Sequence, residues 1–132
     1  MAGSTSDRLP TRKFGRHDDD ISIVGLGGGH ATQQGLGQDG SLRIMRAALD
    51  AGITFVDTAW CYGGQATTGH GYSETLVGRA IDGRREEVFL MSKVCRRDTK
   101  GALGQLEDSL RRLGTDHLDL WQFHEVNYDN DP

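Results

Sequence analysis

The sequence predicts an α/β fold in which four parallel strands alternate with helices. Apolar runs of strand length recur along the chain, and the segments between them carry apolar residues at helical spacing and end in glycine. The predicted strands that begin at residues 53, 88 and 118 start 35 and 30 residues apart, which is a normal period for one strand and one helix. An open doubly wound sheet and part of a (β/α)8 barrel both have this pattern.

The composition is that of a globular domain and argues against several kinds of partner. The chain has 132 residues, of which 36% are hydrophobic and 26% charged, and this suits one soluble domain. With a net charge of -4 and no basic stripe, neither a nucleic acid nor a membrane surface is an expected partner. No apolar run approaches the ~20 residues of a membrane helix, and the N-terminus lacks the apolar core of a secretory signal. Two cysteines are too few for a disulfide scaffold and suit a reducing compartment, so we expect a cytoplasmic protein.

The N-terminal part of the chain is expected to contain a tail, a hairpin, a strand and a loop. Residues 1–11 are small and polar without periodicity, which predicts a flexible tail before a folded domain over residues 12–132. Residues 12–20 suit a short hairpin, residues 21–26 form an apolar strand, and residues 27–40 form a glycine-rich loop.

A regular alternation of helices and strands follows this loop. Ser41 is a good N-cap for a helix that ends at Gly52, because serine accepts hydrogen bonds from the free N–H groups of a first turn. Residues 53–56 then form a strand that ends at Asp57.

The second helix and strand follow another glycine-rich loop, over residues 63–71. Ser73 is predicted to cap a helix that ends at Gly83. Residues 88–91 form the next strand, which ends near Lys93.

The third helix has the clearest periodicity in the chain. Asp98 or Thr99 caps it and Gly114 ends it, and its leucines are predicted to share one buried face. These leucines are Leu103, Leu106, Leu110 and Leu113. Residues 118–123 form the fourth strand, which ends at His124.

Polar residues at the ends of these strands are the strongest functional signal. Asp57, Lys93 and His124 each close an apolar strand, and Tyr62 lies five residues past Asp57. Parallel strands bring their carboxyl ends to one edge, where α/β folds carry their chemistry. A charged group at such a position is costly unless it is paired or used. We therefore expect these four side chains to form a site.

The sequence around these residues resembles the aldo-keto reductase family. Its Asp-Thr-Ala, Tyr-Gly and Ser-Glu-x-x-Leu-Gly motifs are matched by GITFVDTAWCYG at residues 52–63 and YSETLVG at residues 72–78. Its lysine strand is matched by VFLMSK at residues 88–93, and its histidine strand by residues 109–124. The segments RKFG and IVGLG, which begin at residues 12 and 23, are similar to the start of the family's barrels.

The resemblance implies reduction of aldehydes or ketones to alcohols with NADPH. Tyr62 would be the general acid, and Asp57, Lys93 and His124 would be its partners. The chemistry of the residues agrees, because a phenol is a poor acid at neutral pH and a nearby ammonium favours its phenolate form. Asp57 would hold Lys93, and His124 would orient the substrate carbonyl. No side chain supplies a hydride, so the nicotinamide must do so.

The resemblance also suggests where cofactor and substrate lie. Gly28 and Gly29, after the first strand, would let the nicotinamide of NADPH approach the backbone, and Trp60 would line the carbonyl pocket. The segment GLGGGH at residues 25–30 does not match a dinucleotide-binding turn, because its third glycine position is His30 and a loop follows.

The resemblance implies the N-terminal half of a (β/α)8 barrel, truncated after the fourth strand. A complete barrel takes roughly 250 residues, and its last loops bind phosphate. The isolated chain is therefore expected to be poorly active, because most of the cofactor site belongs to the other half. The loop over residues 63–71 is also longer than the family's short link, and it makes Tyr72 a rival to Tyr62 as the acid.

Two alternatives to a reductase remain open from the sequence. Lys93 would serve a Schiff-base lyase, since a lysine at a barrel strand end is a common nucleophile. The chain would instead be a non-catalytic half-barrel fragment or assembly unit if the open edges of its sheet pair with another chain, which implies self-association.

Neither a metal site nor a disulfide is expected. His30, Cys61, Cys95 and His124 would all lie near one edge of the sheet, and such a set suits zinc. No pair among them has the close spacing of a metal motif, however, and nothing in the sequence brings Cys61 and Cys95 into disulfide geometry.

Overall fold

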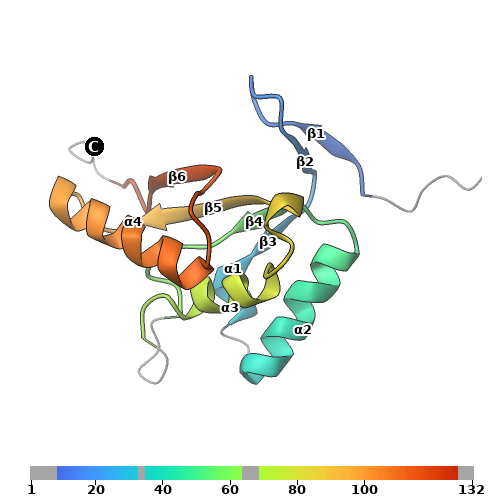
Figure 1. Ribbon diagram of the computed structural model, residues 1–132, viewed down its shortest axis with the longest axis horizontal. Coiled ribbons are helices and arrows are strands. Elements are labelled where there is room, and N and C mark those ends of the chain that lie inside the picture. The colour runs from blue at the N-terminus through green and yellow to red at the C-terminus, as the bar shows by residue number, and fades with distance from the viewer. Residues whose placement is uncertain (1–8, 33–34, 64–68, 128–132) are drawn as a thin grey trace, which may run out of the picture.

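A computed structural model describes residues 9–32, 35–63 and 69–127 of the chain. The described residues form a four-stranded parallel sheet in the order β3-β4-β5-β6, with helices along one side of it and a separate hairpin (Figure 1). The strands are β3 (Gly25–Gly27), β4 (Phe55–Asp57), β5 (Phe89–Val94) and β6 (Leu120–Phe123). The helices are α1 (Gly28–Ala31), α2 (Gly37–Asp50), α3 (Tyr72–Ala80), α4 (Thr99–Leu113) and the short η1 (Arg85–Glu87). None of the described helices is long and apolar enough to cross a membrane.

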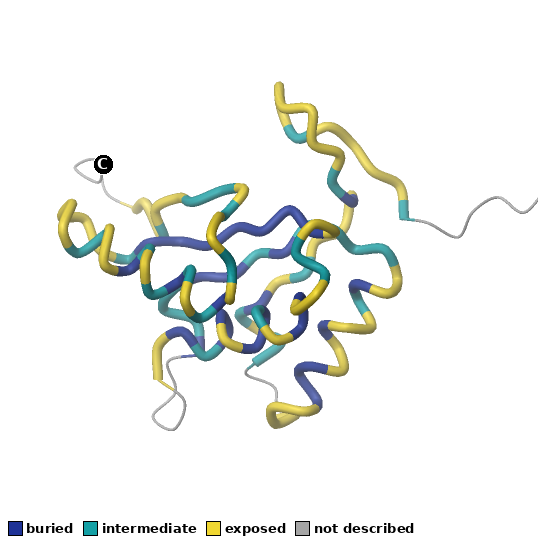
Figure 2. The backbone as a smooth tube through the Cα atoms, viewed as in Figure 1, coloured by how far each residue is buried: buried dark blue, intermediate teal, exposed yellow. Residues whose placement is uncertain are grey.

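The hairpin covers the amino-terminal ends of the central strands. Its strands, β1 (Thr11–Lys13) and β2 (Asp20–Ser22), pair antiparallel, as predicted, and are largely exposed (Figure 2). Phe14 in its turn contacts the rings of Phe55 and Phe89, with centroids 6.2 and 4.8 Å away. These two residues begin β4 and β5, so the hairpin closes the end of the sheet that is opposite the predicted site.

The predicted strand over residues 21–26 is wrong, because this segment belongs to two sheets. Ser22 ends the hairpin, and β3 begins three residues later. Ser22 causes the break, since its Oγ donates to Val24 O at 2.6 Å and accepts from Thr54 N at 2.9 Å. A local hydrogen bond of this kind competes with a continuous strand.

The predicted loop over residues 27–40 is also partly wrong, because it contains α1 and the first turn of α2. Ser41 is not the N-cap of α2, which starts at Gly37. The hydroxyl of Ser41 instead donates to Ala31 O at 2.7 Å and ties α2 to α1.

Ser73 likewise does not cap α3, which begins one residue earlier, at Tyr72. The residue before the helix is Gly71, whose φ of 80° is left-handed and favours glycine. Ser73 is buried, and its Oγ lies 2.9 Å from Thr58 Oγ1. The serine therefore joins α3 to the segment after β4. Most of the preceding loop, residues 64–68, lies outside the described residues.

Helix α4 confirms its predicted ends but not its predicted face. Asp98 Oδ1 accepts from Gly101 N at 2.8 Å, and the chain leaves the helix through left-handed Gly114. Leu103 is 52% exposed, whereas Gln105 is buried together with Ser109 and Leu113. The face of α4 that carries Gln105 packs against the sheet, because Gln105 Oε1 accepts hydrogen bonds from the backbone N–H groups of residues 95 and 96, just after β5.

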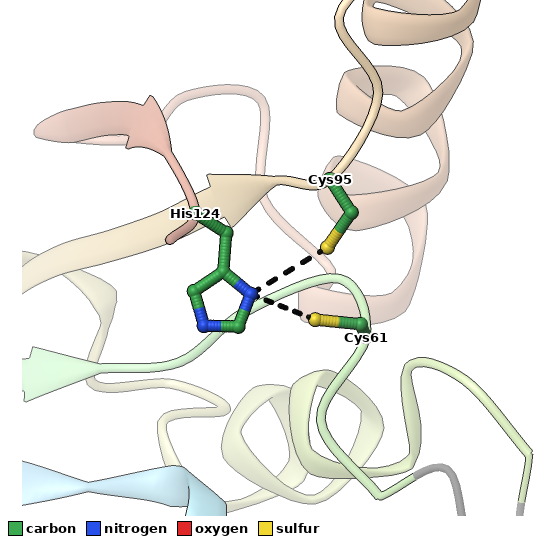
Figure 3. A group of neighbouring side chains, drawn as sticks. All are labelled: Cys61, Cys95 and His124. Atoms are coloured by element: carbon green, nitrogen blue, oxygen red, sulfur yellow. Dashed lines mark hydrogen bonds between the residues drawn. The ribbon is translucent and has the colours of Figure 1, made fainter. Parts of the chain in front are cut away.

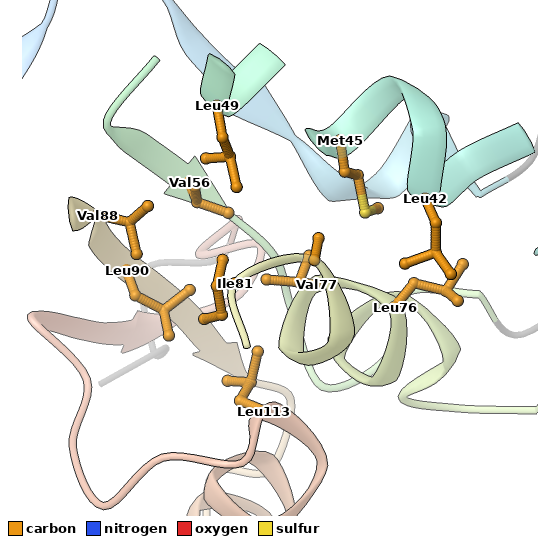
Figure 4. Packing of buried hydrophobic residues seen from close by; sticks show 11 residues of the cluster. Leu42, Met45, Leu49, Val56, Leu76, Val77, Ile81, Val88, Leu90 and Leu113 are labelled. Carbon is orange, nitrogen blue, oxygen red and sulfur yellow. The ribbon is translucent and has the colours of Figure 1, made fainter. Parts of the chain in front are cut away.

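The core lies between the helices and the sheet (Figure 4). It joins β4 and β5 to α2, α3 and the last turn of α4, and all six residues of β5 are buried. The central residues of this core are Met45, Val56, Leu76, Val77, Leu90 and Leu113. This packing holds the parallel strands so that their carboxyl ends lie side by side, with Gly27 opposite Asp57 and Lys93 opposite Gln122.

Candidate active site

An ion pair at the carboxyl ends of β4 and β5 anchors the site. The Lys93 ammonium donates to Asp57 Oδ1 and to Thr58 O, the latter at 2.9 Å. The Lys93 side chain is only 9% exposed, whereas that of Asp57 is 36% exposed. A buried ammonium needs such partners, since an unpaired charge is costly away from water. The pair fixes the ammonium at the edge of the sheet.

Tyr62 is a neighbour of both this ammonium and His124. Lys93 Nζ lies 4.9 Å from the centre of the Tyr62 ring, and the His124 ring lies 5.3 Å from it, edge to face. The turn after β4 positions Tyr62, because Tyr62 N donates to Ala59 O at 3.1 Å. The structure thus brings together the four predicted residues, Asp57, Tyr62, Lys93 and His124, which we call the strand-end cluster.

His124 is held at the end of β6 in a neutral form. Its N–H donates to Val94 O at 2.9 Å, which aligns it with the end of β5. Burial lowers the pKa of His124 below its ordinary value, and the Lys93 charge lowers it further. Glu125 and Asp57 act in the opposite direction without reversing the shift. The imidazole is therefore uncharged at neutral pH, since its ordinary pKa is already 6.5.

Two cysteines lie against the imidazole. Cys61 Sγ lies 3.0 Å from His124 Nδ1 and Cys95 Sγ 3.7 Å from it, whereas Nε2 is on the other side of the ring (Figure 3). Burial, reinforced by the neighbouring Cys95, raises the pKa of Cys61 to about 12. Cys61 is thus a thiol at neutral pH, and an S–H that donates to Nδ1 leaves the ring proton on Nε2.

A buried carboxylate supports the site from behind. Glu74 is fully buried in α3, where it accepts from Ser92 Oγ at 2.7 Å and from Arg112 Nη1 at 3.2 Å. These bonds join α3 to β5 and α4, next to Lys93. This role of Glu74 was not predicted. The sequence signal that could have found it is an acidic residue in the first turn of a predicted helix, three positions after Gly71.

The remaining predicted residues lie apart from the strand-end cluster or are explained by packing. Tyr72, the rival acid, packs against the core from α3. A Cβ on Gly28 would meet the buried Ser73 hydroxyl, and one on Gly29 would lie 3.3 Å from the Tyr62 ring. Both glycines are therefore required for close packing within the chain, and their contact with a cofactor stays a prediction.

Trp60 is placed against the helices. Its ring stacks on His70 at 4.8 Å, its Nε1 donates to Asp108 Oδ2 at 3.5 Å, and the Arg112 guanidinium lies 5.5 Å from it. These contacts direct the indole toward α4. A role for Trp60 in binding substrate stays a prediction that no described contact supports.

Three potential metal ligands lie close together in space although they are far apart in sequence. Three of the four residues considered, Cys61, Cys95 and His124, have ligand atoms within 4.8 Å of one another. They come together because each follows a different strand of one parallel sheet, so their distance in sequence says little about their distance in space.

Comparison with known proteins places this geometry in a family. The family model for the aldo/keto reductase family matches residues 23–132. The chain belongs to the aldo-keto reductase family. Methylglyoxal reductase YeaE of Escherichia coli is 39% identical in an alignment of 112 positions, which covers 80% of this chain and 36% of that protein. Aldo-keto reductase YhdN of Bacillus subtilis is 36% identical over an alignment of 120 positions. This alignment covers 80% of this chain and 34% of that protein.

Solved aldo-keto reductases share the fold. The holo form of an enzyme from Bacillus halodurans superposes with a TM-score of 0.75 at 32% identity, over 93% of this chain and 42% of its own. A Klebsiella pneumoniae enzyme in complex with NADP and acetate has a TM-score of 0.70 at 34% identity. The match covers 80% of this chain and 36% of the Klebsiella chain. The predicted fold, half of a (β/α)8 barrel, is confirmed. The chain spans about 40% of the length of these family members.

Proposed function

We propose that this aldo-keto reductase chain carries the proton-donating part of a site that reduces aldehydes or ketones to alcohols with NADPH. The observation that carries the proposal is the position of Tyr62, with the Lys93 ammonium 4.9 Å from its ring and the His124 ring 5.3 Å from it. A phenol, an ammonium and an imidazole at the open edge of a parallel sheet suit the protonation of an oxygen.

The reduction divides into two transfers, and these residues serve the second. Carbonyl reduction adds a hydride to the carbon and a proton to the oxygen. NADPH, when bound, supplies the hydride. Tyr62 Oη donates the proton, and the phenolate that remains is stabilised by the positive charge of Lys93. Asp57 holds this ammonium in place, so the charge is already positioned before the proton moves.

His124 positions the carbonyl group. Its Nε2–H, left protonated because Nδ1 faces the cysteine thiols, is a donor on the side of the ring away from them (Figure 3). A hydrogen bond from Nε2 to the carbonyl oxygen would place that oxygen near the Tyr62 hydroxyl. An uncharged imidazole suits this role because it adds no second cation beside Lys93.

The structure offers space for the reacting ring of NADPH beside β3. A hollow of about 440 Å³ runs along β3, from hairpin residues such as Ile21 to Gly27 and Asp57 at the carboxyl ends of the strands. No atom lies within 4 Å of the position that a Cβ on Gly27 would occupy, so the backbone there is open to a flat ring. These residues fit the nicotinamide end of the cofactor, and Gly27 and Asp57 would flank it. The NADP bound in the Klebsiella pneumoniae relative supports this choice of cofactor.

The test is aldehyde-dependent oxidation of NADPH by the unaltered chain and by Tyr62→Phe. Methylglyoxal is a suitable first substrate, because the E. coli relative bears the name methylglyoxal reductase. We expect Tyr62→Phe to lower kcat by ~10²–10⁴-fold, the usual contribution of a general acid. Tyr72→Phe is the matched control and should leave the rate unchanged. A measurable rate in the unaltered chain that Tyr62→Phe does not lower would refute the proposal.

The ion pair of Lys93 counts against a Schiff-base lyase. A nucleophilic lysine must be a free amine, whereas Lys93 is bound by a carboxylate and a carbonyl oxygen. Treatment with borohydride in the presence of an aldehyde should therefore leave the mass of residues 88–94 unchanged. A stable adduct on Lys93 would favour the lyase.

A further inference from the structure

Three potential metal ligands meet at the ends of three neighbouring strands. Cys61 follows β4, Cys95 directly follows β5 and His124 directly follows β6. Both sulfur atoms face the same imidazole nitrogen, Nδ1 of His124, at 3.0 and 3.7 Å (Figure 3). All three ligand atoms lie within 4.8 Å of one another, and all three residues are partly buried. They therefore enclose a common point that solvent still reaches.

The backbone around these ligands is fixed by hydrogen bonds. Cys95 N donates to Gln105 Oε1 at 2.8 Å, and Gln105 is itself buried in α4. His124 is held on both sides, because its N–H donates to Val94 O at 2.9 Å and its carbonyl oxygen accepts from Arg97 Nη2 at 2.8 Å. Trp60, next to Cys61, donates its N–H to Lys93 O at 3.1 Å. Ligands held in this way lose little freedom when a metal binds.

The separations suit a tetrahedral ion. Zinc bonds of roughly 2.3 Å to sulfur and 2.0–2.1 Å to nitrogen place tetrahedral ligand atoms roughly 3.5–3.8 Å apart. The two sulfur–nitrogen distances of 3.0 and 3.7 Å bracket the lower end of this range. The sulfur–sulfur separation is at most 4.8 Å, so side-chain movements of up to about 1 Å would complete the geometry.

We propose that Cys61, Cys95 and His124 bind one Zn²⁺ ion. Two sulfurs and one imidazole nitrogen are the ligand set that zinc prefers, and three protein ligands leave a fourth position for water. On binding, each thiol gives its proton to solvent and each thiolate forms a bond to the ion. Two thiolates neutralise the two positive charges of Zn²⁺, so the site adds no net charge beside Lys93.

Zinc at this point would hold the His124 ring through Nδ1 and leave the ring proton on Nε2. The ion would lie beside Tyr62, the neighbour of Cys61 in the chain. This consequence rests on the proposed function, in which the Nε2–H of His124 contacts the carbonyl oxygen. The binding test below does not depend on any activity.

The experiment measures metal binding by the reduced, metal-free chain directly. Zn²⁺ is titrated against a chromophoric chelator, and Co²⁺ is used separately as a spectroscopic probe. We expect one equivalent of Zn²⁺ per chain, and the Co²⁺ form should show thiolate-to-cobalt charge-transfer bands with the intense visible bands of a tetrahedral site. Cys61→Ser and Cys95→Ser should each weaken binding by at least ~100-fold, more than the usual effect of removing an outer partner of a ligand.

The control variant is His117→Asn, which removes an exposed histidine from the opposite end of β6. It should bind zinc as the unaltered chain does. If a serine variant loses its helical circular dichroism, Cys→Ala at the same position replaces it, and the Co²⁺ spectrum of the unaltered chain decides independently. Absence of stoichiometric binding, a Co²⁺ spectrum without thiolate bands, cysteines that remain disulfide-bonded in reductant, or serine variants that bind zinc as tightly as the unaltered chain would overturn the proposal.

Discussion

The buried charged side chains of this protein depend on the groups that hold them in place. Lys93 is useful at the edge of the sheet because Asp57 and Thr58 O satisfy its charge. Glu74 is comparable, since it is fully buried and depends on Ser92 and Arg112. A charge removed from water is tolerated only with its partners. The residues behind the strand-end cluster are therefore as sensitive to substitution as the cluster itself.

Arg112→Ala should destabilise the chain by about 3 kcal/mol, because it leaves Glu74 buried without its positive partner. This value is at the low end for a broken buried pair, since the Arg112 side chain is 25% exposed. Arg111→Ala is the matched control: Arg111 pairs with Asp108 on the surface, and the loss should stay below about 1 kcal/mol. Urea denaturation measures both. Equal losses would show that the buried carboxylate does not depend on Arg112.

At this scale the sequence predicted the strand-end cluster but not the contacts of the cysteines. Asp57, Lys93 and His124 were predictable because a polar residue that closes an apolar strand has few structural explanations. The proximity of Cys61 and Cys95 was not predictable from spacing, because it depends on how far two neighbouring strands extend at the same edge. Their shared neighbour, His124 Nδ1, becomes visible only with the strands in register.

Helices α3 and α4 are in close contact. A Cβ on Gly78 of α3 would lie 2.6 Å from Arg112 O and 2.8 Å from Leu113 O. Two helices approach so closely only where one of them lacks a side chain. This contact also aligns Glu74 on α3 with Arg112 on α4.

Gly78→Ala should therefore lower the free energy of unfolding by ~1–3 kcal/mol, because the backbone of α4 cannot easily move away. Gly104→Ala in α4 is the matched control. No atom lies within 4 Å of the position of its Cβ, so the better helix propensity of alanine should stabilise the chain by up to ~1 kcal/mol. Thermal or urea unfolding distinguishes the two. A neutral or stabilising effect of Gly78→Ala would contradict the described contact.

The sequence predicted the order of the helices and strands better than the start of two helices. Ser41 and Ser73 both looked like N-caps, yet their hydroxyls bond to Ala31 O and to Thr58 Oγ1 in other parts of the fold. A serine between a loop and an apolar helix has the same local pattern in either role. Asp98 was predicted correctly because its carboxylate bonds within its own helix turn.

At the scale of the whole molecule, the described sheet has two free edges. Strands β3 and β6 each pair with one neighbour among the described strands, as expected for half of a barrel. Unpaired strand edges attract other strands. The parallel arrangement and the shared edge of the strand-end cluster were predictable from the alternating pattern. The small contact surface between hairpin and sheet was not, because it depends on three phenylalanines that are far apart in sequence.

We expect the chain to self-associate through these edges, so that its mass in sedimentation equilibrium rises with concentration. Phe123→Lys places a charge at the end of edge strand β6 and should weaken association by at least ~10-fold. Leu103→Lys, a change of the same kind on an exposed part of α4, should have no effect. A mass that does not depend on concentration, or equal effects of both variants, would exclude pairing through β6.

The role of Tyr62 in carbonyl reduction can be tested by following the transferred hydrogen atoms. The chain is incubated with methylglyoxal and NADPH that carries deuterium at the transferable position of the nicotinamide, and the alcohol is analysed by mass spectrometry. We predict one deuterium on the carbinol carbon, with the amount of labelled alcohol falling by ~10²–10⁴-fold in Tyr62→Phe and unchanged in Tyr72→Phe. An unlabelled product, or equal labelled product from Tyr62→Phe and the unaltered chain, would contradict the assignment of Tyr62 as the proton donor of a carbonyl reductase.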